Sequence, residues 1–260
     1  MKRKLFSLIA IATLTTTAWA DISTEQLEKY MKASGVDVVL QKAQKEVVTG
    51  MQMKAKMRGR ELPKELLNKI EKIVTKKENL EKFTKGIKSL DEKDYKEIMK
   101  FYNTKLGQKS AEIVRNMDIK NMKAEIAEFS KKALPKEREL LISKLIELTM
   151  SEKQTENMAK VVMQSTLEAL PKELQEKLKA KMDAQLAQMK PIMKQQVKAN
   201  VTYAYKNYSN EELKSLIKYY KTSPAQAEAT AMIDGPTEYL KSIMSEMIQV
   251  MIEMKQKKSE

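Results

Sequence analysis

The chain contains no cysteine and no histidine among its 260 residues, and its one tryptophan is Trp19. Without these side chains the protein can form no disulfide, no thiolate nucleophile, no Cys/His zinc site, and no histidine-based triad or proton shuttle. Carboxylates, Lys, Tyr, Ser and Thr remain as the groups available for chemistry. We therefore expect no catalytic, cofactor-binding or metal-binding residues and no cofactor.

Glycine and proline are also scarce, at six residues each, and the alternating apolar and polar pattern of strands is nearly missing. Lys, Glu, Leu, Met, Ala and Gln, which favour helices, fill most positions. Hydrophobic residues make up 42% of the chain, which is enough for substantial cores at this length. The composition predicts an all-α protein.

The first 20 residues have the pattern of a cleavable signal peptide. A basic start is followed by a mostly apolar run over 5–17 and by Ala18-Trp19-Ala20, which places small residues where a signal peptidase reads them. The apolar run is shorter than the roughly 20 residues of a membrane-spanning helix. Cleavage before Asp21 would remove three basic and no acidic residues, lowering the net charge from +14 to +11. We therefore expect a periplasmic protein without a lipid anchor, because no cysteine is present to carry one.

Several motifs predict where helices begin. Capping boxes pair a serine with Gln or Glu three residues later, and Leu-Pro-Lys-Glu places proline and an acidic residue in a first helical turn. A long helix is expected from Pro171 to about Tyr208, and Pro191 should kink or break it. The other expected starts are the boxes Ser23/Gln26, Ser151/Gln154 and Ser209/Glu212, the motifs at 62–65, 134–137 and 170–173, and the turns Ser223-Pro224 and Asp234-Gly235-Pro236.

An internal duplication organises the chain. The Leu-Pro-Lys-Glu-Leu segment at 62–66 recurs at 170–174, and the segment at 94–104 aligns with 212–222 at an offset of 118. We expect two tandem helical-bundle repeats, with an elongated shape as one possibility. The expected division is a signal peptide at 1–20, a first unit at 21–132, a linker at 133–137 and a second unit at 138–260.

The duplicated segments carry an aromatic pair, a threonine and then a turn of small residues. This pattern resembles the signature of a family of exported bacterial proteins catalogued as a domain of unknown function, number two-zero-five-nine. The second copy departs from it at Ala225, where glycine is usual. The resemblance implies an all-helical periplasmic domain without assigned catalytic residues. The matching positions are Phe101, Tyr102, Thr104 and Gly107 in the first copy, and Tyr219, Tyr220, Thr222, Ser223 and Pro224 in the second.

The signature also has a plain structural interpretation. Tyr95, Ile98, Met99 and Tyr102 follow the spacing i, i+3, i+4, i+7 of an apolar helix face, and the second copy repeats it. We therefore favour a packing role for these residues. A ligand pocket lined by Tyr102 and Tyr220 is the alternative.

Methionine is abundant, with 19 residues, and it gathers in the last predicted helix. Spacings of four and three there place five apolar residues on one seam. Core packing is the favoured interpretation, because thioethers fill irregular helical cores. A Cu(I) site, an adaptable groove for a peptide or acyl chain, and a homodimer seam are the alternatives. The five residues are Leu240, Met244, Met247, Met251 and Met254.

The basic charge is carried almost entirely by lysine, since only five of the 49 basic residues are arginine. Nucleic-acid binding is disfavoured, because phosphate recognition prefers arginine and export removes the protein from nucleic acid. Weak association with anionic envelope surfaces is one hypothesis.

Taken together, these patterns predict a non-enzymatic, chaperone-like or envelope-associated factor that binds an unknown protein, peptide or acyl partner. The alternative is a carboxylate-based hydrolase, although no spacing isolates two acidic residues as a catalytic pair.

Overall fold

The computed structural model describes residues 21–116, 118, 121–168 and 170–256, so the predicted signal peptide lies outside the described residues. Every regular element in these ranges is an α-helix, which confirms the all-α prediction. The helices are α1 (Thr24–Ser34), α2 (Val36–Met57), α3 (Lys64–Thr75), α4 (Lys77–Lys88), α5 (Glu92–Tyr102), α6 (Lys105–Asn116), α7 (Lys123–Ser130), α8 (Lys136–Leu148), α9 (Ser151–Glu168), α10 (Lys172–Ala204), α11 (Asn210–Tyr220) and α12 (Ser223–Gln256).

Most of the predicted helix starts are confirmed. Complete capping boxes at Ser23 and Ser209 begin α1 and α11. The prolines of the three Leu-Pro-Lys-Glu motifs are the N-cap residues of α3, α8 and α10, each with ψ near +140°. Ser223 is the first residue of α12. Side-chain caps and proline geometry are local effects, which is why the sequence alone identifies them.

α9 begins at Ser151 as predicted, but its predicted capping box does not form, and the predicted start at Asp234-Gly235-Pro236 is wrong. Gln154 does not close a capping box with Ser151, because its side-chain amide donates to the Met232 carbonyl at 3.0 Å. That carbonyl has no helical partner, since residue i+4 is Pro236, which lacks an N–H. Gln154 on α9 thereby supplies the missing hydrogen bond, and α12 continues through Asp234-Gly235-Pro236 instead of beginning there.

The predicted break at Pro191 is also absent. α10 runs from Lys172 to Ala204 with Pro191 inside it, which confirms the single long helix. Pro191 is exposed, so water can satisfy the carbonyl that its ring leaves unpaired.

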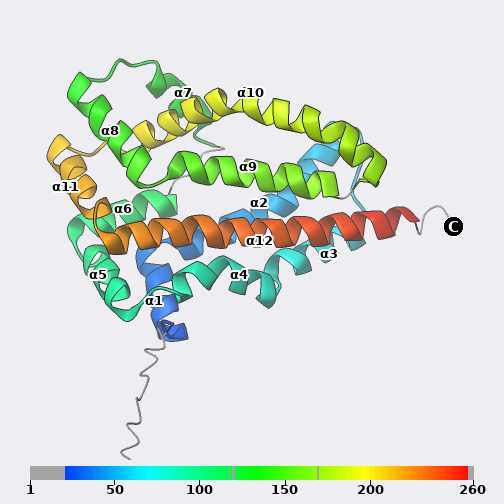
Figure 1. Cartoon of the computed structure of the whole chain (residues 1–260), viewed down its shortest axis with the longest axis horizontal. Coiled ribbons are helices and arrows are strands. Elements are labelled where there is room, and N and C mark those ends of the chain that lie inside the picture. Colours follow the sequence, from blue (N-terminus) through cyan, green and yellow to red (C-terminus); the bar gives the residue numbers. More distant parts are fainter. Residues whose placement is uncertain (1–20, 117, 119–120, 169, 257–260) are drawn as a thin grey trace, which may run out of the picture.

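α12 runs along the long axis of the molecule, with α4 on one side and α9 on the other (Figure 1). One core lies where α12 packs on α2, α3 and α4, and it buries Ile70, Phe83, Ile243 and Met247. Another core joins Phe101 of α5 to side chains from α8, α10 and α11. The predicted units 21–132 and 138–260 therefore share their cores across the connection at 133–137.

The close crossing of α4 and α12 depends on two glycines. A Cβ on Gly235 of α12 would lie 2.1 Å from the Phe83 carbonyl oxygen on α4. A Cβ on Gly86 of α4 would lie 2.8 Å from the Ala231 carbonyl oxygen on α12. Both distances are shorter than any non-bonded carbon–oxygen contact, so each helix needs glycine where it meets the other backbone.

We expect Gly235→Ala to lower the free energy of unfolding by about 2–3 kcal/mol, because the new methyl group forces the two backbones apart. The matched control is Gly50→Ala inside α2, where a Cβ would meet nothing within 4 Å. That control should raise stability by about 0.5–1 kcal/mol, since alanine is the better helix former. Urea unfolding of the three proteins measures both effects. Equal stability of the two variants would contradict the close crossing.

Candidate functional site

The two copies of the aromatic signature end α5 and α11 with the same hydrogen bonds. Thr104 Oγ1 donates to the Phe101 carbonyl, and Thr222 Oγ1 donates to the Tyr219 carbonyl, each at 2.7 Å. Each carbonyl also accepts the backbone N–H of the same threonine at 2.9 Å, so both helices end in the same tight turn. The two segments at offset 118 thus share local geometry as well as sequence.

The copies differ at the position of the signature glycine. The Gly107 N–H donates to Thr104 Oγ1 at 3.0 Å, and a Cβ on Gly107 would lie only 2.0 Å from the Phe101 carbonyl oxygen. Alanine could not occupy that turn. Because Ala225 stands at the equivalent place and is fully buried, the second copy must hold its helices slightly further apart.

The aromatic residues of the two copies meet in the interior. The rings of Phe101 and Tyr219, which are equivalent at the offset of 118, stack with centroids 3.6 Å apart and planes 10° from parallel. Tyr102 also packs edge-on against Phe101 and Tyr30. Sequence reasoning placed Tyr102 on an apolar helix face and favoured a packing role for the signature, but it could not show that the two copies face each other.

A buried carboxylate, Glu228 of α12, lies at this meeting point and is 5% exposed. Tyr30 of α1 and Tyr102 of α5 donate their hydroxyls to Oε1 at 2.8 and 2.7 Å, and Tyr219 of α11 donates to Oε2 at 3.0 Å. Burial raises the pKa of the Glu228 carboxyl, and the three hydroxyls oppose that shift by favouring the ionised form. Burial also raises the pKa of each of the three tyrosines, with the nearby Glu228 charge as the second cause.

Sequence analysis missed Glu228, although a signal was present. Glu228 is the one charged residue in the run Pro224–Ile233, and the buried Ala225 and Ala231 lie three residues before and after it on the same helix face. A carboxylate on an apolar helix face requires buried hydrogen-bond donors. The pattern does not show which tyrosines provide them.

The enclosed Glu228 cluster has the features of a structural junction. The main surface cavities of the described chain are lined by other residues. Each tyrosine hydroxyl is used as a donor to the carboxylate, so a substrate could reach Glu228 only by separating the helices. The cluster therefore ties α1, α5, α11 and α12 together.

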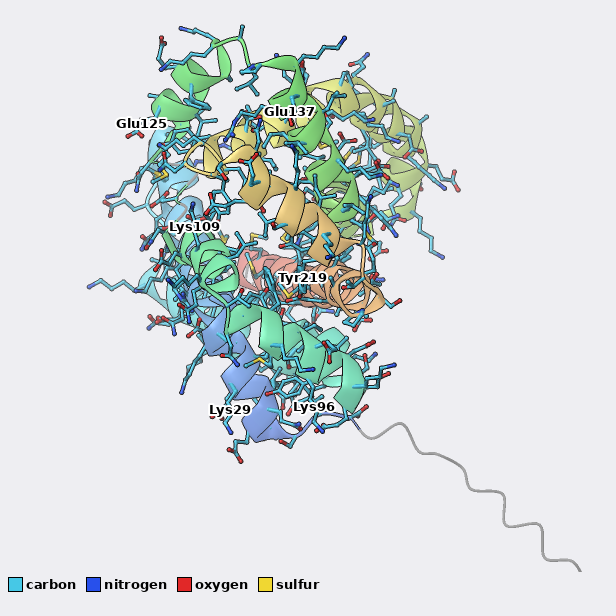
Figure 2. All side chains as sticks on the ribbon, turned by 90° about the vertical axis from the view of Figure 1, so that its left-hand side faces the viewer. Lys29, Lys96, Lys109, Glu125, Glu137 and Tyr219 are labelled. Carbon is cyan, nitrogen blue, oxygen red and sulfur yellow. The ribbon has the colours of Figure 1, made fainter. Side chains whose placement is uncertain are left out.

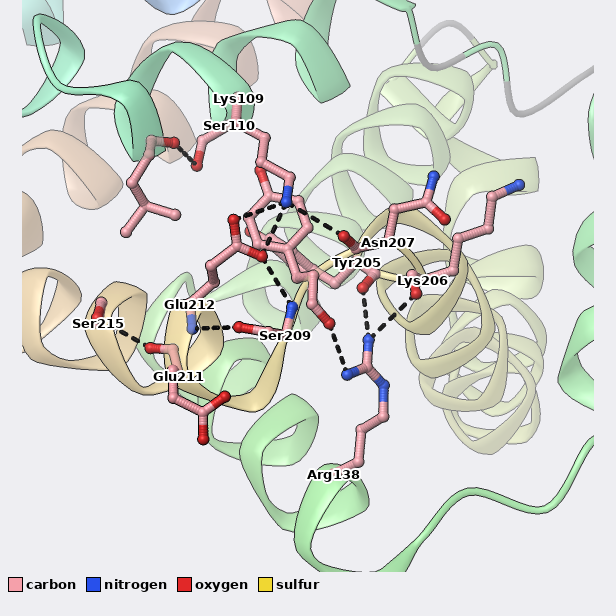
Figure 3. A network of polar contacts seen from close by, with 12 residues as sticks. Lys109, Ser110, Arg138, Tyr205, Lys206, Asn207, Ser209, Glu211, Glu212 and Ser215 are labelled. Atoms are coloured by element: carbon pink, nitrogen blue, oxygen red, sulfur yellow. Dashed lines mark hydrogen bonds and ion pairs between the residues drawn. The ribbon is translucent and has the colours of Figure 1, made fainter.

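A second polar cluster joins α6 to the turn between α10 and α11 (Figure 3). Lys109 Nζ donates to both Glu212 carboxylate oxygens, at 2.7 and 2.8 Å, and lies 4.1 Å above the centre of the Tyr208 ring. The hydrogen bond from Lys109, followed by that from the Ser209 N–H, lowers the pKa of the Glu212 carboxyl. Arg138 donates to the Tyr205 and Tyr208 carbonyls at 2.7 and 2.8 Å, which covers the end of α10. These side chains also serve the fold.

The five residues of the predicted seam divide between two environments. Leu240, Met247 and Met254 pack in or against the core that α12 shares with α2, α3 and α4. Met244 is half-buried outside that cluster, and Met251 is 39% exposed. Core packing thus accounts for three of the five seam residues, and these three are spaced seven residues apart.

A groove with several apolar lining residues runs along α9 and α10. One cavity of about 620 Å³ lies among α8, α9 and α10, and a smaller one of about 130 Å³ continues along α9 and α10. Lys160 lines both, so the two lie end to end. We call the combined feature the α9–α10 groove, and its apolar lining residues are Ile146, Met150, Met163, Leu167, Met182, Leu186, Met193 and Val197.

Lysine–glutamate pairs form the rim of this groove. Glu156 of α9 pairs with Lys190 of α10 at 3.0 Å and with Lys160 at 2.7 Å, and Glu152 pairs with Lys194 at 3.2 Å. All of these side chains remain substantially solvated, so each pair contributes little to stability. The hydrogen bonds from Lys160 and Lys190 lower the pKa of the Glu156 carboxyl.

The described residues contain no group of three or more acidic side chains arranged to hold a metal ion. No helix within the described ranges combines the length and apolar character needed to cross a membrane. No family model, characterised protein or solved structure matches the chain. The resemblance to the exported family therefore stays a prediction.

We expect Glu228→Gln to fold and to be as stable as the wild type or more stable at pH 7. The amide oxygen can accept from Tyr30 and Tyr102, the amide nitrogen can donate to the Tyr219 oxygen, and the cost of burying a charge disappears. Glu228→Ala should instead lose about 2–4 kcal/mol, because it leaves three buried hydroxyls without an acceptor and opens a cavity. Chemical unfolding of both variants measures the difference.

Comparison of the wild type with Glu228→Gln also tests the raised pKa of Glu228. Because its pKa is raised in the folded state, the native protein binds this proton more readily than the unfolded chain does. Stability from this group should therefore rise as the pH falls through the raised pKa toward the ordinary value of 4.5. Glu228→Gln should lack that rise, which is measured as the wild-type minus variant difference to cancel the exposed carboxylates. Parallel pH profiles would contradict a raised pKa.

Proposed function

We propose that the protein is an exported, non-enzymatic binding factor, with a chaperone-like role in the envelope, that holds an apolar segment of a partner in the α9–α10 groove. The observation that carries this proposal is the methionine lining of the groove. Met150, Met163, Met182 and Met193 lie along one surface, half-buried, with cavity space beside them. Unbranched thioether side chains adapt to differently shaped partners, as expected of a surface that accepts varied apolar sequences.

The dimensions of the groove fit a peptide. Its lining on α10 extends from Lys179 to Val197, which is about 27 Å at 1.5 Å per residue. That length accommodates a helix of about five turns or an extended segment of about eight residues.

The rim favours a partner that carries charges of both signs. Lysines and acidic residues alternate there, and the Glu156–Lys190 and Glu152–Lys194 pairs connect α9 to α10 across the larger cavity. Opening these solvated pairs costs little, and their groups could then pair with a bound segment.

The competing hydrolase hypothesis has less support. A hydrolase of this kind needs two carboxyl groups on opposite sides of a substrate. The carboxylates of the larger cavity, Glu147, Glu152 and Glu156, each pair with lysine, and Asp183 of α10 lines only the smaller cavity. Glu228, whose raised pKa would suit an acid catalyst, is enclosed by tyrosines.

We also infer that the chain is a tandem repeat whose two units pair about an approximate two-fold axis. The helix order supports this inference: α1 and α2 correspond to α8 and α9, α3 and α4 to α10, α5 to α11, and α6 to the start of α12. Pro63 and Pro171, which cap α3 and α10, stand at equivalent positions in the two units. The stacking of Phe101 on Tyr219, two equivalent residues, is the contact expected near a two-fold axis.

The binding proposal is tested with residues 21–260 and a fluorescently labelled model peptide of Leu, Ala, Gln, Lys and Glu that forms an amphipathic helix. Fluorescence anisotropy should show saturable binding. The double variant Met163→Gln/Met182→Gln should weaken binding about tenfold or more, because it removes two apolar contacts from the groove. Suppression of aggregation of a chemically unfolded client, followed by light scattering, should decline in parallel.

The matched control is Leu140→Gln on α8, which removes a 64% exposed apolar side chain outside the groove. Binding by this variant should equal that of the wild type, and thermal unfolding should confirm that all variants fold. Unchanged binding by the groove variant, or an equal loss in the control, would exclude the α9–α10 groove as the binding site.

A further inference from the structure

The corner between α2 and α3 exposes apolar side chains next to basic ones. Met57, the last residue of α2, is 83% exposed, the highest value among the large apolar side chains described. Met53, one turn earlier on the same helix, is 51% exposed. Exposing both side chains to water is unfavourable, which indicates a surface that another apolar phase could cover.

The corner is held in a defined shape. The N–H groups of Arg58 and Arg60 both donate to the Ala55 carbonyl at 3.0 Å, and the Gly59 N–H donates to the Lys56 carbonyl at 2.9 Å. Gly59 has φ of +66°, which favours glycine, and a Cβ there would meet nothing within 4 Å. The backbone therefore turns tightly while its side chains project into solvent.

Basic side chains surround the exposed methionines. Lys56, Arg58, Arg60 and Lys64 are all exposed, and Glu61 is the only acidic residue between positions 54 and 64. None of the ion pairs in the described part of the chain involves these four basic residues. Their charges are therefore available to an anionic partner.

Two arginines elsewhere in the protein have their guanidinium groups bound to backbone carbonyls. Arg115 donates to the Lys32 and Ala33 carbonyls at the end of α1, and Arg138 covers the end of α10. Those two guanidinium groups serve the fold. For Arg58 and Arg60, the other two arginines after the first 20 residues, the described part of the chain shows no such side-chain contact, and a Cβ on Gly59 between them would meet nothing within 4 Å.

We propose that this corner is a docking surface for a bilayer containing anionic phospholipid. Met53 and Met57 enter the boundary between headgroups and acyl chains, while Lys56, Arg58 and Arg60 contact lipid phosphates. Apolar insertion combined with basic side chains is the physical basis of peripheral membrane binding. An acidic protein would satisfy the basic groups but would not require two adjacent methionines to project. The inference is independent of the α9–α10 groove.

Co-sedimentation of residues 21–260 with vesicles tests the proposal. Binding is expected to vesicles of equal parts phosphatidylglycerol and phosphatidylcholine at low salt, and it should weaken as salt rises. The triple variant Lys56→Gln/Arg58→Gln/Arg60→Gln should reduce partitioning about a hundredfold, from about 1 kcal/mol per basic residue near the surface. Met57→Ser should reduce it about tenfold without changing the net charge.

The matched control is Lys32→Gln/Lys93→Gln/Lys105→Gln, which removes the same charge from α1, α5 and α6 at the other end of the molecule (Figure 1). This control should keep nearly wild-type binding, as should the groove variant Met163→Gln/Met182→Gln.

An equal loss in the control would show general charge attraction and overturn the proposal. Three other results would also overturn the docking proposal: equal binding to pure phosphatidylcholine vesicles, no wild-type binding at low salt, or unchanged binding of Met57→Ser. The corner residues are exposed, so circular dichroism should show unaltered thermal unfolding.

Discussion

The arrangement of the helices depends on a buried carboxylate that is satisfied by three hydroxyl groups. Glu228 can remain in the interior only if donors from other helices reach it, and Tyr30, Tyr102 and Tyr219 do so from three different helices. This requirement fixes the position of α12 relative to α1, α5 and α11. Once α12 is placed, Gly86 and Gly235 let it approach α4, and Gln154 attaches α9 to the carbonyl that Pro236 leaves free. Apolar packing alone would not specify one orientation so strictly, because it is not directional.

The charged side chains on the surface constrain the fold much less than the buried Glu228 cluster does. Lys29 and Lys96 lie on the outer faces of α1 and α5, paired with acidic residues one turn away (Figure 2). Such pairs keep the helices solvated and contribute little to stability. Apolar side chains are also exposed to solvent along the α9–α10 groove and at the α2–α3 corner. Neither of these two features includes Glu228 or its three tyrosine partners among its residues.

Local features of the fold could be predicted from sequence, and long-range ones could not. The caps at Ser23 and Ser209 and the proline starts depend on contacts within one turn, so the sequence identifies them. The failure at Asp234-Gly235-Pro236 has a tertiary cause: a glycine and a proline that usually end helices are used here for close packing and for a hydrogen bond from α9. Likewise, the periodicity of α12 showed an apolar seam, but it could not show that Met247 packs in a core while Met251 is 39% exposed. Whether a seam residue is buried depends on which other helices pack against that part of α12.

The sharing of cores between the two halves of the chain determines the order of folding. Phe83 and Ile70 are buried against Ile243 and Met247, so the core of the first half is completed by the 34-residue helix at the end of the chain. During synthesis, α2, α3 and α4 emerge long before α12 is available to cover them. These contacts have a large sequence separation, which slows folding and leaves apolar surface open meanwhile. The first half therefore cannot complete its core until α12 has been synthesised.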